Sequence, residues 1–134
     1  MSSIEWKDRL NWTDEHIEDL RYTGFSYIRQ GKYDIALPFF EALEILDPAS
    51  AYDAQTLGAI YLQIHQYDQA LKCFDRSLKL ESEDHSPTLI NLAKTLFAMG
   101  KKEEGLKLVN ILKKEKNPLV ANIAKALLLA YSPS

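Results

Sequence analysis

The sequence predicts an all-α protein in which three helix-turn-helix units, with flanking helices, stack into a superhelix. Three observations support this prediction. Apolar residues recur at helical spacing, a short motif repeats about every 34 residues, and glycine or proline stands between the helical segments. With 134 residues, of which 46% are hydrophobic and 26% charged, the chain is large enough to build one core of its own.

Two sets of small residues define the repeat. The first set is Gly24, Gly58 and Ala93, and the second set is Ala36, Ala70 and Gly105. Small side chains allow two helices to approach closely, so each pair is expected to mark the contact between the two helices of one unit. Aromatic residues are expected to fill the space between the helices as core residues, namely Tyr27, Phe40, Tyr61 and Phe74.

The expected elements follow in order along the chain. An N-terminal segment covers residues 1–16, and Thr13 or Asp14 can cap the helix that comes next. The first repeat covers 17–50, where Gly31 supplies the turn and Pro48 ends the second helix. The second repeat covers 51–84, the third repeat covers 86–117, and a C-terminal capping helix covers 118–131.

The charge and the cysteine content indicate which partners and which cellular compartment to expect. The net charge of -3 is opposite in sign to the surface that binds a duplex, so no nucleic acid partner is expected. The single Cys73 cannot form an internal disulfide, as is typical of a reducing compartment. Residues 1–10 carry four charged side chains instead of a signal peptide, and segment 118–131 is too short and too polar to span a bilayer. We expect a cytoplasmic protein without membrane insertion.

The charges are unevenly distributed along the chain. Residues 1–53 contain eleven acids and five bases, a balance of -6, whereas residues 54–134 contain eight acids and eleven bases, a balance of +3. Lysines gather around the third repeat, at Lys101, Lys102, Lys113, Lys114 and Lys116. This pattern is typical of a solvated outer helix face, and a docking patch for an acidic partner is the alternative.

No set of residues in the sequence indicates an enzyme. His16, His65 and His85 lie in different units, and none of them forms a zinc pair at helical spacing. The segment between Gly100 and Gly105 lacks the Lys-Ser/Thr pair that a phosphate loop requires. We therefore expect no catalytic residues, no metal and no cofactor.

The repeat resembles the tetratricopeptide repeat, a helix-turn-helix unit with a period of about 34 residues. The residues at the signature positions are Leu20, Gly24, Tyr27, Ala36, Phe40 and Pro48 in the first repeat and Leu57, Gly58, Tyr61, Ala70 and Phe74 in the second. The third repeat departs from the signature, because Gly105 and Val109 stand for the usual alanine and aromatic residue. The resemblance covers residues 17–117.

A stacked array of this kind exposes the first helix of each pair on its concave face. The small-residue register predicts a partner-binding groove made of Arg21, Phe25, Ile28, Arg29, Tyr52, Gln55, Ala59, Leu62, Gln63, Ile90, Lys94 and Phe97. Co-chaperones with this repeat grip a terminal carboxylate with lysines and asparagines, but the matching positions here hold Arg21, Phe25, Gln55 and Ala59. The groove is instead apolar and suits an extended peptide with small hydrophobic anchors. The alternative is that the N-terminal residues Ile4, Trp6, Leu10 and Trp12 cover part of it.

The junction of the first two repeats carries a closer resemblance. The run Phe40, Ala42-Leu43, Leu46-Asp47 and Leu57-Gly58-Ala59, followed by residues 66–70, is similar to the small acidic chaperones of bacterial type III secretion, above all those of the hydrophobic translocators. The resemblance implies a non-enzymatic protein of the bacterial cytoplasm that holds an extended segment of a secreted client. A needle-subunit or export-apparatus chaperone and a general scaffold remain alternatives. A homodimer or a second chaperone is a further possible partner.

Overall fold

The computed structural model describes residues 5–132. Among these residues it contains eight α-helices and no β-strand: α1 (Trp6–Arg9), α2 (Asp14–Arg29), α3 (Tyr33–Leu46), α4 (Ala51–Gln63), α5 (Tyr67–Leu78), α6 (Ser86–Ala98), α7 (Lys102–Leu112) and α8 (Pro118–Tyr131). The prediction of an all-α superhelix is therefore confirmed.

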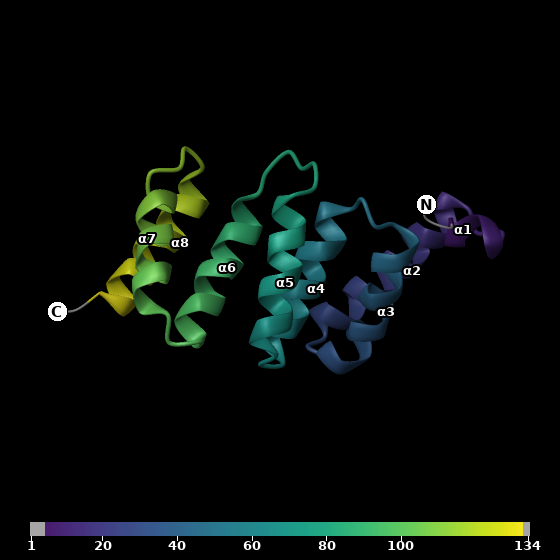
Figure 1. Ribbon diagram of the computed structural model, residues 1–134, viewed down its shortest axis with the longest axis horizontal. Helices are drawn as coiled ribbons and strands as arrows, with labels where there is room; N and C mark the ends of the chain where they lie inside the picture. The colour runs from purple at the N-terminus through teal and green to yellow at the C-terminus, as the bar shows by residue number, and fades with distance from the viewer. Residues whose placement is uncertain (1–4, 133–134) are drawn as a thin grey trace.

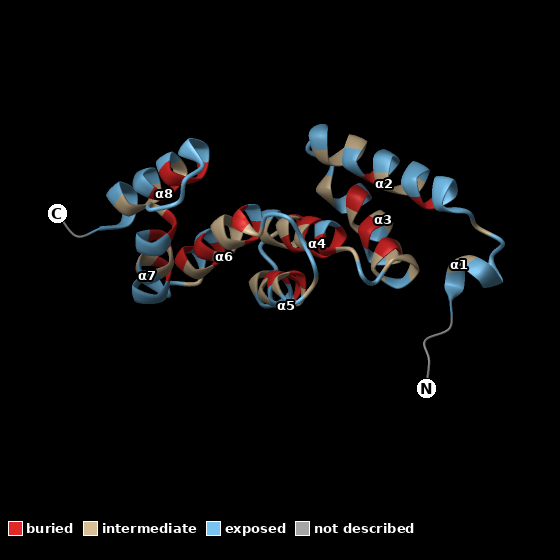
Figure 2. Ribbon diagram, turned by 90° about the horizontal axis from the view of Figure 1, so that it is seen from above, coloured by how far each residue is buried: buried red, intermediate tan, exposed pale blue. Residues whose placement is uncertain are grey.

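The helices form two layers that follow the chain order (Figure 1). Helices α2, α4, α6 and α8 make one layer, α3, α5 and α7 make the other, and from α2 onward every helix packs against the next. Seen from above, α2 and α8 rise on the same side of the central helices, so the first layer lines the concave face (Figure 2). We call α2, α4, α6 and α8 the inner helices.

A tight turn of one type closes each of the three helix pairs. The turn residue has a positive φ in every case: +73° at Gly31, +63° at His65 and +79° at Gly100. The next amide donates back to a carbonyl five residues earlier, at 2.9 Å for Lys32 to Tyr27 and 2.8 Å for Gln66 to Tyr61 and for Lys101 to Leu96. This bond is part of the Schellman motif, in which glycine is favoured because it has no β-carbon.

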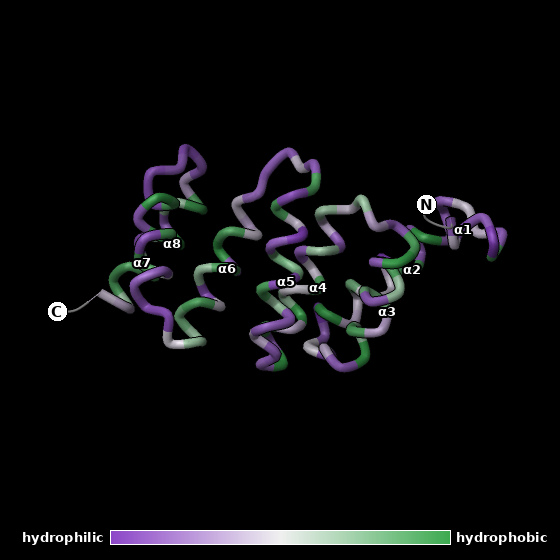
Figure 3. Tube along the Cα trace, in the orientation of Figure 1, coloured by the Kyte–Doolittle hydropathy of each residue, from purple (hydrophilic) through white to green (hydrophobic). Residues whose placement is uncertain are grey.

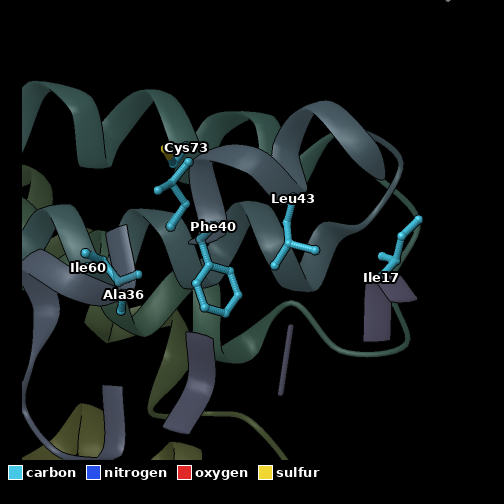
Figure 4. Packing of buried hydrophobic residues seen from close by; sticks show 7 residues of the cluster. Ile17, Ala36, Phe40, Leu43, Ile60 and Cys73 are labelled. Carbon is cyan, nitrogen blue, oxygen red and sulfur yellow. The ribbon is translucent and has the colours of Figure 1, made fainter. Parts of the chain in front are cut away.

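The core consists of two clusters of buried hydrophobic residues. The first cluster joins α2, α3, α4 and α5 and contains Ile17, Ala36, Phe40, Leu43, Leu57, Ile60 and Cys73 (Figure 4). The second cluster joins α6, α7 and α8 and contains Ala93, Phe97, Val109, Leu112, Val120 and Ala124. Because Cys73 is only 4% exposed within the first cluster, burial raises the pKa of its thiol, and the residue behaves as a packing side chain.

A glycine pressed against an aromatic ring sets the separation of the two helices in each pair. A β-carbon added to Gly58 would lie 2.6 Å from Cε1 of Phe74, and one added to Gly24 would lie 2.8 Å from Cε2 of Phe40. Real contacts are longer than 3 Å, so no larger residue fits at either position without movement of the ring.

The third pair uses the same contact with the two roles exchanged. Here the ring belongs to Phe97 on the inner helix, and the glycine is Gly105 on the outer helix, whose added β-carbon would lie 2.6 Å from the ring. The ring position of the outer helix is held by Val109, which is fully buried. The departure of the third repeat from the signature is therefore one coordinated exchange between α6 and α7.

An ion-pair network fastens α2 to α4. The guanidinium of Arg21 donates to both carboxylate oxygens of Asp53, with Nε to Oδ1 at 2.7 Å and Nη2 to Oδ2 at 2.6 Å. It also donates to Asp47 at 3.0 Å and pairs with Glu18. The Asp53 side chain is 1% exposed, so its charge depends on this bidentate partner for compensation. The hydrogen bonds to Asp53 raise the pKa of Arg21 further above its ordinary value.

We expect Gly58→Val to lower the free energy of unfolding by about 2 kcal/mol or more, because the new methyl groups must displace the buried Phe74 ring. Chemical denaturation measures this loss. The matched control is Gln63→Val, an exposed site on the same helix that reports only the cost of a β-branched residue. An unchanged unfolding midpoint for Gly58→Val would show that the ring does not limit the helix separation.

We expect Arg21→Met to cost about 3–5 kcal/mol of unfolding free energy, because it leaves the buried Asp53 carboxylate without a counter-ion. The double variant Arg21→Met with Asp53→Leu removes both charges and should recover most of the loss. Equal unfolding energies for the single and double variants would contradict this account of the network.

Candidate binding groove

A hollow of about 240 Å³ lies on the concave face between α2 and α4. Its lining residues are Phe25, Ile28, Tyr33, Tyr52, Gln55, Thr56, Ala59, Ile60 and Gln63. Two aromatic rings form its open walls, since Phe25 is 39% and Tyr52 is 48% exposed. The hollow brings together six of the residues that the sequence places in the groove.

A second, smaller hollow of about 100 Å³ continues the first toward α6. It shares Tyr52 and Gln55 with the first hollow and adds Ala51, Ser77, Ser82, Asp84, Pro87 and Thr88. The Ser86 amide donates to Asp84 at 2.9 Å and, with the Ser86 side chain, lowers the pKa of that carboxyl, which is therefore ionised at neutral pH. The two hollows together form one groove with an apolar end at α2 and a polar, acidic end at the α5–α6 loop.

The side chain of Phe25 is held in place by a cation. The guanidinium of Arg29 lies 5.4 Å from the centroid of the Phe25 ring, within the range of a cation–π contact. Both residues are one helical turn apart on α2, so the local sequence fixes the ring as a platform. Apolar ligand groups can pack against its free face.

Arg21 lies on the same face of α2 but serves the fold. Its donors are directed to Asp53, Asp47 and Glu18, and its side chain is only 16% exposed. It therefore presents no unpaired cation to a ligand, which agrees with the absence of a carboxylate-gripping set at this position.

Toward the third unit the predicted residues divide between surface and core. Lys94 is exposed, and Leu62 and Ile90 are half-buried. Phe97 is only 8% exposed because Gly105 lies under its ring and Tyr131 of α8 stacks on it at 4.0 Å. Phe97 thus packs in the core and contributes to neither hollow.

The sequence register did not identify three residues that line the larger hollow, namely Tyr33, Thr56 and Ile60. Tyr33 begins the outer helix α3, whereas the register predicts groove residues on the inner helices alone. The positive φ at Gly31 turns the chain so that the first residue of α3 meets the groove. A tyrosine two residues after the turn residue also occurs in the second pair, as Tyr67, so the signal was present in the repeat.

Residues 5–16, the described part of the N-terminal segment, do not cover the groove. Helix α1 packs against α3, and Trp6 and Leu10 remain 42% and 50% exposed. Trp12 packs against the first core cluster, and Ile4 lies outside the described residues. A wider hollow of about 510 Å³ lies between α1 and the end of α3, and one of about 450 Å³ lies along α2, both apart from the groove residues.

Residues 5–132 contain neither a metal-binding cluster nor a membrane-spanning helix. Within this range no group of three or more histidine, cysteine, aspartate or glutamate residues is placed to hold a metal ion. None of the helices in the described part of the chain is long and apolar enough to cross a membrane.

Solved structures with the same fold include two that hold a segment of another protein. The chaperone SycD of Yersinia enterocolitica, bound to a peptide of the translocator YopD, is 21% identical with a TM-score of 0.74 over 88% of this chain and 96% of that one. PcrH, bound to the chaperone binding region of PopD, is 23% identical with a TM-score of 0.77 over 90% and 93%.

A third structure shows that the fold is not limited to secretion. The first repeat domain of Spaghetti (RPAP3), bound to the HSP90 peptide SRMEEVD, is 20% identical with a TM-score of 0.73 over 90% of this chain and 97% of that one. At these identities the structures establish the fold.

Family membership follows from sequence. No curated protein matches the chain. A family model described as anaphase-promoting complex, cyclosome, subunit 3 matches residues 29–112, which include α3 to α7. Together with the three stacked helix pairs and the glycine–ring contacts, this match over more than half of the sequence shows that the chain belongs to that tetratricopeptide-repeat family.

Proposed function

We propose that this protein is a non-enzymatic chaperone that holds an extended hydrophobic segment of a type III secretion client in its groove. The observation that carries the proposal is the pair of hollows joined at Tyr52 and Gln55. An exposed aromatic pair beside a small apolar hollow is a surface that a folded monomer does not need for its own stability. It suits a peptide that inserts one apolar side chain next to Phe25 and Tyr52.

The groove shape favours an extended peptide over a folded partner. Its two hollows lie one after the other across the inner helices, so a ligand must present side chains in sequence along its own backbone. Gln55 lies at the junction, where its amide can bond to the backbone of such a peptide. Binding buries apolar client residues that would otherwise associate with each other, and the client stays soluble as long as it is bound.

The secretion role is supported by the structural neighbours. SycD was solved with a peptide of the translocator YopD, and PcrH with the chaperone binding region of PopD. A complex of type III secretion proteins from Aeromonas hydrophila also shares the fold, with a TM-score of 0.77. The client class is therefore a translocator, a needle subunit or an export component, met in the bacterial cytoplasm before secretion.

A second candidate function is a scaffold that assembles another protein complex. The observation that favours it is the matching family model, whose description names a subunit of a multiprotein complex. The acidic chaperone peptide bound by the Spaghetti domain is a poor fit to this groove, since Arg21 is already paired and Asp84 adds negative charge. The two functions predict different ligands for the same hollows.

Titration calorimetry with peptides tests the proposal. The peptides are 24 residues long and are selected from a random phage-displayed library, and a second set tiles any secreted protein that is found to be encoded beside this gene. We expect Phe25→Ala and Tyr52→Ala each to weaken the tightest peptide about tenfold, with a negative heat-capacity change in the wild type. The control Ile45→Ala removes an apolar side chain that is 59% exposed outside the groove and should change the affinity less than twofold.

Two results would contradict the proposal. If the selected peptides bind equally to the Phe25 and Tyr52 variants, the groove is not their site. If library peptides bind in the groove while no tile from a secreted protein binds, the secretion role is contradicted and the scaffold function replaces it.

A further inference from the structure

Helix α8 repeats the burial pattern of the other inner helices. When α4 and α8 are aligned at their first residues, Ala51 and Pro118, the buried Asp53 and Leu57 of α4 correspond to the buried Val120 and Ala124 of α8. On α4 the buried Asp53 pairs with Arg21 of the preceding inner helix α2, and on α8 the buried Val120 and Ala124 pack in the cluster shared with α6 and α7, so this side of each helix faces the preceding helix pair. The same alignment places the remaining residues of α8.

The same alignment assigns a second face of α8 to the concave side. The groove positions predicted on α4 are Tyr52, Gln55, Ala59, Leu62 and Gln63, of which all but Leu62 line a hollow, and they correspond to Leu119, Asn122, Ala126, Leu129 and Ala130 of α8. All five α8 residues are exposed, Leu119 by 67% and Leu129 by 82%. Figure 2 shows α8 beside the concave space, opposite α2.

This face is unusually apolar for the end of a helical array. A terminal helix that only closes a stack carries polar residues on its free side. Here the free side carries two leucines and two alanines, and the C-terminal part of α8 is hydrophobic along its trace (Figure 3). Tyr131, the aromatic residue of α8, stacks on Phe97 within the chain, whereas Leu119 and Leu129 remain exposed.

The charge around this face has one sign. Neither α6 nor α8 contains an acidic residue, and the exposed cations on them are Lys94 and Lys125. Lys94 occupies the groove position of α6 that corresponds to Ala59 of α4. The opposite end of the inner face carries exposed charges of both signs, Glu18 and Arg29 on α2. An acidic side chain of a ligand is therefore attracted to the lysines at the α6–α8 end, whereas Asp84 repels it at the α5–α6 loop.

We propose that α8 is a fourth inner helix of the groove. Its exposed face binds the end of the client segment, where apolar residues of the client are flanked by an acidic side chain of the client. This inference rests on the proposed function, because it lengthens the same groove. It adds a ligand-binding face to the helix 118–131 that is expected to cap the third unit. The occupant is the client chain, since α8 packs beside α6, α6 packs beside α4, and the exposed face of α8 thus continues the layer of inner helices that carries Tyr52 and Gln55.

Site-specific photo-crosslinking tests the inference with the tightest 24-residue library peptide as the probe. Benzoylphenylalanine is introduced at position 52 in the groove, at 119 and 129 on α8, and at the exposed apolar positions 45 and 111 as controls. We expect cross-links to the peptide from 52, 119 and 129 but not from 45 or 111. Replacing the peptide's acidic residue nearest the 129 cross-link by lysine should weaken binding several-fold, and Lys94→Glu should reverse that preference.

Affinity measurements give an independent readout. Leu119→Glu with Leu129→Glu should weaken the probe about tenfold, whereas Ile111→Glu, at a residue 64% exposed on α7, should change it less than twofold. All of these sites are exposed, so circular dichroism and the thermal midpoint should match the wild type.

The outcomes separate the two proposals. Cross-links from 52 without any from 119 and 129, together with an unchanged affinity of the double variant, overturn the inference and leave the proposed function in place. Cross-links from 119 or 129 to a second copy of the chain also overturn it, since the face is then a dimer contact. The absence of cross-links from all inner positions removes both proposals.

Discussion

The distance between the two helices of a pair is the constraint on which the rest of this structure depends. Gly58 against Phe74, Gly24 against Phe40 and Gly105 against Phe97 hold that distance at ring contact. Since the pairs are stacked, the same spacing sets how the inner helices lie beside one another and how far the concave face opens. The groove is therefore a product of residues that no ligand touches, and its hollows remain open because the fold is complete without filling them.

Polar residues on the inner face follow a similar division of labour. The sequence register predicts that Arg21 lies in the groove, yet its guanidinium forms an ion pair with the buried Asp53, and this pair joins the inner helices α2 and α4. With that charge neutralised, recognition at the α2 end falls to the Phe25 and Tyr52 rings, which favour apolar ligand groups. The cations that remain exposed on the concave side lie elsewhere, at Arg29 beside the Phe25 ring and at Lys94 on α6.

Much of the fold could be predicted from the sequence because periodic small and apolar residues report helix contacts directly. The helix pairs, the glycine turns and six lining residues of the larger hollow follow from that register. The burial of Phe97 did not follow from this register, because it depends on Tyr131, which lies outside the repeat motif. The role of Arg21 depended on a buried partner 32 residues away, and the exposed face of α8 on a three-dimensional alignment with α4. Such long-range relations leave no local periodic signal.

The exchanged glycine and ring of the third pair make its helix contact incompatible with the contact used in the first two pairs. A unit built like the first two carries its ring on the outer helix, and the third carries it on the inner helix. Restoring alanine and an aromatic residue at Gly105 and Val109 would put two rings into one gap, although each change alone brings the sequence closer to the repeat signature. Because the Phe97 ring already fills the gap against Gly105, a ring on the outer helix would fit only if the ring on the inner helix were removed at the same time.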